Sequence, residues 1–128
     1  MSETVTRGVR ITVQPRFVPE QSNTGASQYL FAYHITIRNE GHETVQLLSR
    51  HWVITNGEGR VEEVRGPGVV GYQPILAPGE EFQYTSGCPL GTPVGTMHGE
   101  FNMVVADTRE NFDARISPFR LAVPSVLN

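Results

Sequence analysis

Short runs in which apolar and polar residues alternate recur along the chain, and this feature constrains the fold most. The clearest run is residues 29–41, YLFAYHITIRNEG. Alternate residues of a β-strand point to opposite faces, so this spacing places the large apolar side chains on one side. The residues that share that side are Tyr29, Phe31, Tyr33, Ile35 and Ile37. The pattern predicts a half-buried strand.

The same period predicts further strands before and after this one. Val9, Ile11 and Val13 share a face in an earlier run, and the polar segment 19–28 is expected to be a loop. Later strands are expected at residues 45–54, 60–64, 81–87, 96–105 and 112–123, with a Gly/Pro loop at 88–95. The turn signals Asn39-Glu40-Gly41 and Asn56-Gly57-Glu58-Gly59 separate neighbouring runs. Successive strands are therefore joined by short connections.

Two irregularities in the runs predict bulges. Val45 and Leu47 occupy odd positions, whereas Trp52 and Ile54 occupy even ones, so the phase slips by one residue near residues 49–51. One extra residue in one strand of a pair is what a β-bulge supplies. Pro118 lies inside the last run and cannot donate to a ladder, which predicts an edge strand or a bulge there.

About seven short strands without an amphipathic helix predict an all-β fold. The expected architecture is an antiparallel β-sandwich of immunoglobulin or fibronectin type III-like kind, with a small closed barrel as the alternative. The length of 128 residues suits a single domain spanning 1–128.

Charge and cysteine content limit the partners and the compartment. A formal net charge of -3 favours neither nucleic acid nor an anionic membrane as a partner. All ten cationic side chains are arginine, for which genomic base composition is the simpler explanation. Cys88 is the single cysteine, and the N-terminal residues lack the apolar stretch of a signal peptide. These features predict a cytoplasmic protein, and they predict no particular oligomeric state.

The segment RGPGVVG, residues 65–71, carries the spacing Gly66-x-Gly68-x-x-Gly71. In dinucleotide-binding folds such glycines precede a helix whose N-terminus receives the phosphates. Residues 66–80 contain four glycines and three prolines, so no helix can follow. The glycines are therefore expected to serve backbone geometry. A weaker hypothesis makes Arg65, with Arg50 at the same end of the sheet, part of an anion-binding nest.

No motif predicts a catalytic, cofactor or metal site. His34, His42, His51 and His98 lack metal-ligand spacing. The sequence Ser86-Gly87-Cys88 is not a nucleophile elbow.

The apolar residues of the glycine segment permit two interpretations. Val69, Val70, Tyr72 and Ile75 either contact a partner or cover the open end of the core. The second interpretation is slightly favoured.

Several motifs together resemble the ApaG family, also called CorD. They are Arg50-His51-Trp52, the glycine motif from Val64 to Gly71, Gln73-Pro74, Pro78-Gly79-Glu80 and Tyr84-Thr85-Ser86-Gly87. Asn56 and Phe101 depart from the aspartate and tyrosine usual at those positions. The resemblance implies a fibronectin type III-like sandwich without established catalytic residues. It also implies an association with cobalt and magnesium homeostasis, a gene neighbourhood shared with diadenosine tetraphosphate hydrolysis, and protein-interaction roles in eukaryotic relatives.

These observations lead to a non-enzymatic binding domain, with a protein partner, as the first hypothesis. The loop residues Arg50, Arg65, Gly66, Gly68, Gly71 and Tyr72 are the candidate site. The alternative is a sensor of a phosphorylated metabolite or a divalent metal, and an enzyme of diadenosine polyphosphate metabolism ranks third.

Overall fold

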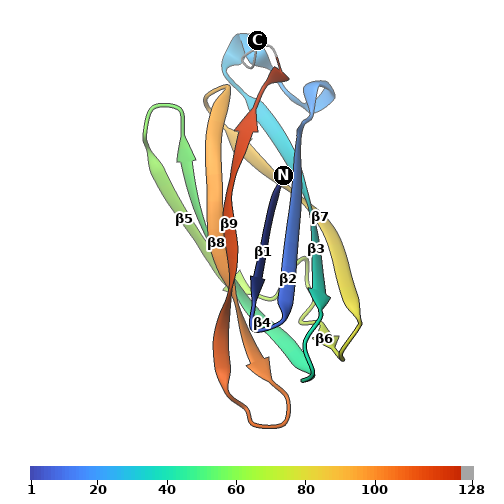
Figure 1. The fold of residues 1–128 in the computed structure, drawn as a ribbon. Coiled ribbons are helices and arrows are strands. Elements are labelled where there is room, and N and C mark those ends of the chain that lie inside the picture. Colours follow the sequence, from blue (N-terminus) through green and yellow to red (C-terminus); the bar gives the residue numbers. More distant parts are fainter. Residues whose placement is uncertain (125–128) are drawn as a thin grey trace.

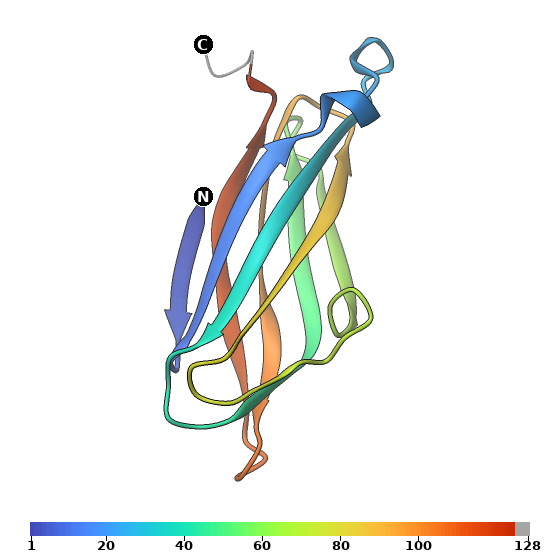
Figure 2. The same cartoon turned by 90° about the vertical axis from the view of Figure 1, so that its right-hand side faces the viewer.

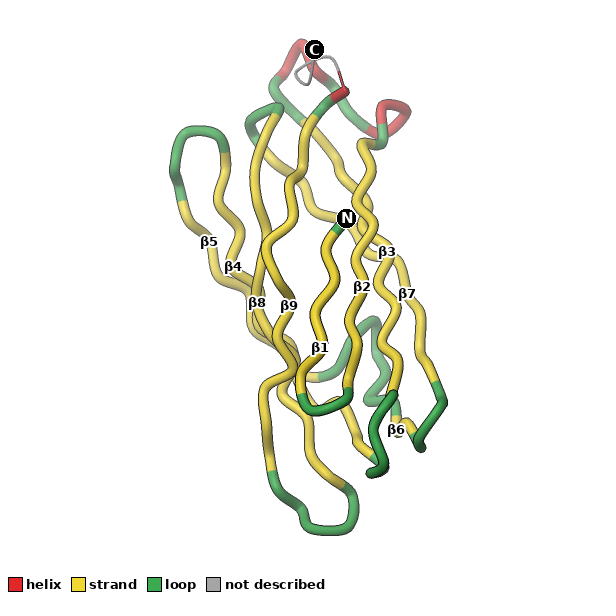
Figure 3. Tube along the Cα trace, in the orientation of Figure 1, coloured by secondary structure: helices red, strands yellow, loops and turns green. Residues whose placement is uncertain are grey.

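The computed structural model describes residues 1–124, and most of them lie in strands (Figure 1). The nine strands are β1 (Ser2–Thr6), β2 (Val9–Phe17), β3 (Tyr29–Asn39), β4 (Val45–Asn56), β5 (Val61–Pro67), β6 (Ile75–Leu76), β7 (Glu81–Leu90), β8 (Val94–Val105) and β9 (Asn111–Ala122). Residues 1–124 contain no α-helix, and their helical turns are short 3-10 turns near one end of the molecule (Figure 3). No helix in this part of the chain is long and apolar enough to span a membrane.

The strands form two antiparallel sheets packed face to face. The first has the order β1-β2-β3-β7 and the second β5-β4-β8-β9, with β6 paired to β4. Figure 2 views the sandwich with the first sheet in front and the second sheet behind it. The predicted antiparallel sandwich is confirmed, and the chain does not form the alternative closed barrel.

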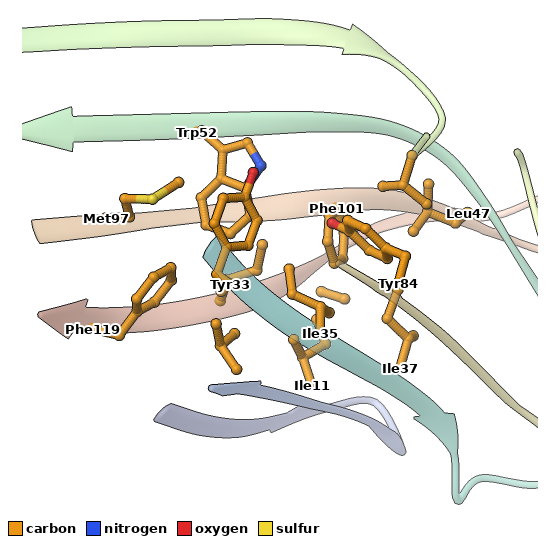
Figure 4. Close-up of a cluster of buried hydrophobic side chains, with 14 of the residues drawn as sticks. Ile11, Tyr33, Ile35, Ile37, Leu47, Trp52, Tyr84, Met97, Phe101 and Phe119 are labelled. Carbon is orange, nitrogen blue, oxygen red and sulfur yellow. The ribbon is translucent and has the colours of Figure 1, made fainter. Parts of the chain in front are cut away.

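The apolar side chains of both sheets fill the space between the layers (Figure 4). The predicted inward faces are confirmed: Val9, Ile11 and Val13 are at most 1% exposed, and Phe31 is equally buried. Trp52 lies at the centre, with its ring edge-to-face against the rings of Tyr33, Phe101 and Phe119. Such aromatic contacts contribute beyond the area that they bury.

Both predicted irregularities are bulges. The register of β4 against β8 shifts between Leu47 and Ser49, one residue before the predicted position. The register of β8 against β9 shifts opposite Ser117 and Pro118, and β9 is also an edge strand of its sheet. The proline thus lies where a sheet can accommodate a missing N–H.

Some boundaries were wrong. β1 was missed because SETVT is mostly polar, and β6 because two residues show no period. The loop expected at 88–95 is only residues 91–93, since β7 continues through Pro89 to Leu90. β7 is an edge strand, where proline is tolerated. The strand expected at 60–64 runs instead from Val61 to Pro67.

The two sides of the sandwich are closed differently. On one side β1 lies along β9, and the hydroxyl groups of Thr4 and Thr6 accept hydrogen bonds from the backbone N–H groups of Ser117 and Arg115, each at 3.1 Å. On the other side the edge strands β5 and β7 are not paired with each other. Figure 2 shows this open side at the right, with the residue 67–73 loop beside it.

Candidate functional site

The glycine segment connects two β elements. β5 ends at Pro67, Val69 and Tyr72 form an antiparallel bridge, and β6 begins at Ile75. The expectation that no helix follows Gly71 is confirmed. The segment therefore lacks the helix N-terminus that receives phosphates in dinucleotide-binding folds.

A tight turn forms the tip of this loop. The N–H of Val69 donates to the carbonyl of Tyr72, and the N–H of Tyr72 donates back to the carbonyl of Val69, both at 2.8 Å. The two central residues, Val70 and Gly71, have φ angles of 42° and 87°, which is the pattern of a type I′ turn. Glycine adopts this region freely, but a β-branched residue such as Val70 does so under strain.

The second glycine is required by a close approach. Gly68 has a φ of 59°, and a Cβ atom there would overlap the carbonyl oxygen of Tyr72. Since that oxygen belongs to the backbone of the turn, a side chain at residue 68 would force the turn to move. The predicted structural role of the glycines holds here.

Arg50 fixes the loop from inside the sandwich. It lies opposite Gly66 in the β4–β5 ladder, and its Nη1 donates to the carbonyl oxygens of Pro67 and Gly68, each at 2.9 Å. A Cβ atom on Gly66 would lie 2.9 Å from Nη2 of Arg50. The first glycine thus makes room for the guanidinium group.

The bulge in β4 supplies a second attachment. The carbonyl oxygen of Leu48 accepts hydrogen bonds from the N–H of Gly68 and from Nε2 of Gln73, both at 2.8 Å. A bulge residue leaves the regular ladder, so its carbonyl is free for such a contact. The phase slip and the glycine motif, which are separate signals in the sequence, therefore belong to one structural unit.

The loop divides its apolar side chains between the core and the surface. Val69 is 1% exposed and covers the core. Val70, Tyr72 and Ile75 are 50%, 62% and 61% exposed, respectively. The Tyr72 ring also packs against Phe82 of β7, with a centroid distance of 5.8 Å, so the loop bridges part of the open side. The interpretation that this segment covers the core is thus confirmed for Val69, whereas contact of the exposed residues with a partner stays a prediction.

Arg50 and Arg65 lie on opposite faces of the second sheet. Arg50 faces inward with Gly66, whereas Arg65 pairs with His51 on the outer face, and its side chain is 71% exposed. The N–H groups of Gly68, Val69 and Tyr72 donate within the protein. The two residues of the proposed anion nest thus lie on opposite faces of the pleat, although both border one surface hollow with His51 and Gly66, and anion binding there stays a prediction.

A charged cluster on the outer face was not found from the sequence. Nδ1 of His51 lies 2.6 Å from Glu100, and Nε2 lies 2.7 Å from Glu63. These two hydrogen bonds raise the pKa of His51, and the bond with Glu100 contributes most. The hydrogen bond between His51 and Glu63 also lowers the pKa of Glu63. The residues come from β4, β8 and β5, so only the strand order brings them together. Because both imidazole nitrogens are engaged, His51 is poorly placed to accept a substrate proton.

Two of the remaining candidates, His34 and Cys88, lie in structural surroundings that do not require a catalytic role. His34 hydrogen-bonds Thr85 and Gln83 on its predicted polar face. Burial raises the pKa of Cys88 to about 11, which disfavours the reactive thiolate. Within residues 1–124 no group of three or more His, Cys, Asp and Glu side chains is placed to hold a metal ion.

The geometry defines an antiparallel β-sandwich domain whose open side is partly covered by a glycine loop. A family model described as the ApaG domain matches residues 19–105. Protein ApaG of Methylobacterium sp. (strain 4-46) is 56% identical over 126 residues, which covers 98% of this chain and 96% of the relative. Protein ApaG of Rhodospirillum centenum is 53% identical, and the match covers 97% of this chain and 95% of that relative. The chain belongs to the ApaG family.

A solved structure supports the same conclusion. The putative ApaA protein from Bordetella pertussis superimposes with a TM-score of 0.88 at 54% identity, covering 91% of this chain and 94% of that one. The names of these relatives state no enzymatic activity.

Proposed function

We propose that this protein is a non-enzymatic binding domain that recognises a protein partner through Val70, Tyr72 and Ile75, here called the apolar loop surface. The observation that carries this proposal is that all three are at least half exposed, Val70 and Tyr72 on a loop fixed by internal hydrogen bonds and Ile75 at the start of the adjoining strand β6. Exposed apolar groups are a common basis of protein recognition, and tyrosine is enriched at interfaces.

The fixed loop conformation favours binding. Arg50 and Gln73 hold the loop against β4, so little conformational entropy is lost when a partner binds. Val70 keeps a strained backbone while its side chain is exposed. Strain of this kind is found at functional sites, where it is offset by the surrounding structure.

The chemistry of the polar groups supports a role without catalysis. Both nitrogens of His51 are engaged by carboxylates, and Cys88 is buried with a raised pKa. The cobalt and magnesium association implied by the family resemblance is then indirect and acts through the partner.

Site-specific photo-crosslinking in native cells tests the proposal. A benzophenone amino acid at residue 72 is expected to capture a protein that is not captured from residue 61. Val61 is a matched control because it is 59% exposed on β5. The captured protein is then purified, and its affinity is expected to fall at least about tenfold with Tyr72→Ala but not with Val61→Ala.

Equal binding by the two variants would contradict the proposal. So would saturable binding of pyrophosphate or Co²⁺, seen as amide shifts at residues 65–71, with no protein captured from residue 72. That result would favour the sensor of a phosphorylated metabolite or divalent metal.

A further inference from the structure

A cavity of about 230 Å³ lies between the two sheets at the open side of the sandwich. It is lined by residues of both layers, including Tyr33, Arg50, Trp52, Glu62, Val64 and Ser86. It exists because β5 and β7 are not paired with each other, while the opposite side is closed by β1 and β9. The glycine loop covers the neighbouring part of this side through the contact of Tyr72 with Phe82.

Arg50 contributes a positive charge to the cavity, and this charge is not engaged in an ion pair within the described residues. Its hydrogen-bond acceptors are the neutral carbonyls of Pro67 and Gly68. Both of these bonds use Nη1, so Nε and Nη2 retain donors. A guanidinium with free donors in a partly buried position favours a carboxylate or phosphate partner.

The walls beside Arg50 are aromatic and apolar. The rings of Tyr33 and Trp52 meet edge-to-face with centroids 5.4 Å apart, and both side chains are more than nine-tenths buried (Figure 4). Met97 lines the same cavity. An apolar cavity with a few polar groups is the usual composition of a small-molecule site.

Size and charge narrow the ligand class. The volume is below the roughly 300–1,000 Å³ typical of sites for drug-sized ligands, so a nucleotide is too large. Glu62 faces inward from β5 and lines the same cavity, so it opposes a second negative charge. A singly charged anion with a small apolar body fits these constraints better than a phosphate dianion.

We infer that this inter-sheet cavity binds a small monocarboxylate, whose carboxylate pairs with Arg50 and whose apolar body lies against Tyr33 and Trp52. This site is separate from the apolar loop surface, and neither proposal requires the other.

Intrinsic fluorescence provides a direct test, because Trp52 is the only tryptophan. Benzoate is the probe, benzamide its neutral analogue and phenyl phosphate its dianionic analogue. Titration with benzoate is expected to change Trp52 emission saturably. Benzamide is expected to bind at least about tenfold more weakly, because it lacks the charge that pairs with Arg50. Phenyl phosphate is expected to bind more weakly than benzoate.

Variants of the cavity wall leave the loop contacts of Arg50 intact. Glu62→Gln removes, at an exposed position, a negative charge that repels the carboxylate of benzoate. This substitution is expected to strengthen benzoate binding about two- to fivefold. Val64→Phe is expected to fill the cavity and abolish binding. Tyr72→Ala is expected to leave benzoate binding unchanged, which separates this proposal from that of a protein partner.

Several outcomes would overturn the inference. They are the absence of a saturable signal with benzoate, equal binding of benzoate and benzamide, tighter binding of phenyl phosphate, or an unchanged affinity in Glu62→Gln. Because Glu62→Gln is measured independently, the test remains decisive if Val64→Phe fails to fold.

Discussion

Gly66 lies directly opposite Arg50 on the inner face of the β4–β5 ladder, where it leaves the space that the guanidinium group occupies. Through that group the first glycine of the motif is linked to the carbonyls of Pro67 and Gly68. The position of the Arg50 side chain thus depends on the absence of a side chain at Gly66.

Gly66→Ala is expected to displace Arg50 and lower the free energy of unfolding by about 1–3 kcal/mol, the usual contribution of hydrogen bonds from a charged donor. Urea denaturation measures this change. Gly91→Ala is the matched control, because Gly91 has no positive φ and no neighbouring atom within 4 Å of a Cβ. If the effect acts through Arg50, Gly66→Ala adds little in an Arg50→Met background. Full additivity would contradict this mechanism.

Val70→Asn is expected to stabilise the protein by about 1 kcal/mol, since asparagine tolerates the left-handed backbone better than a β-branched residue. The midpoint of urea unfolding reports the gain. Val61→Asn, at an exposed strand position, is expected to give no gain. If Val70 also contacts a partner, Val70→Asn combines higher stability with weaker binding. A loss of stability in Val70→Asn would show that the backbone of residue 70 is not strained.

The His51 cluster makes stability depend on pH. The folded pKa of His51 is raised, so its contribution is present below the unfolded value of about 6.5 and is lost as pH rises through the folded pKa. The folded pKa of Glu63 is lowered, so its contribution is lost as pH falls through that value. The difference in the free energy of unfolding between wild type and His51→Gln is therefore expected to be largest at pH values between the folded pKa of Glu63 and the folded pKa of His51.

Histidine titration by NMR checks the cause of this dependence. Glu100→Gln is expected to lower the pKa of His51, because the hydrogen bond with Glu100 makes the largest contribution to the shift. An unchanged pKa of His51 in Glu100→Gln would contradict the assignment.

Thr4→Val and Thr6→Val test how the closed side is held. Each substitution keeps the side-chain shape but removes the acceptor for a β9 amide, so each is expected to cost about 1–2 kcal/mol. Amide exchange at Ser117 is expected to accelerate in Thr4→Val, and at Arg115 in Thr6→Val. Thr12→Val on the outer face of β2 is the control. Exchange that matches wild type at both amides would mean that these hydroxyls do not hold the edge.

The sequence by itself determined the strands with strong alternation. Residues 29–39 and 9–13 carry their buried faces in the spacing of apolar residues, because a strand repeats every two residues. The slip in β4 and the exclusion of a helix after Gly71 also follow from local geometry. Local signals failed for β1, which is held by pairing with β2 and by contacts with β9.

Only the tertiary structure decided which distant residues meet. His51, Glu63 and Glu100 come together because β4 lies between β5 and β8, and no spacing along the chain encodes that order. Likewise, Arg50 and Arg65 are expected from the sequence at the same end of the sheet, yet the pleat places them on opposite faces. Periodicity gives the faces of each strand, whereas contacts between strands depend on sheet order and register, which are set by packing of the whole core.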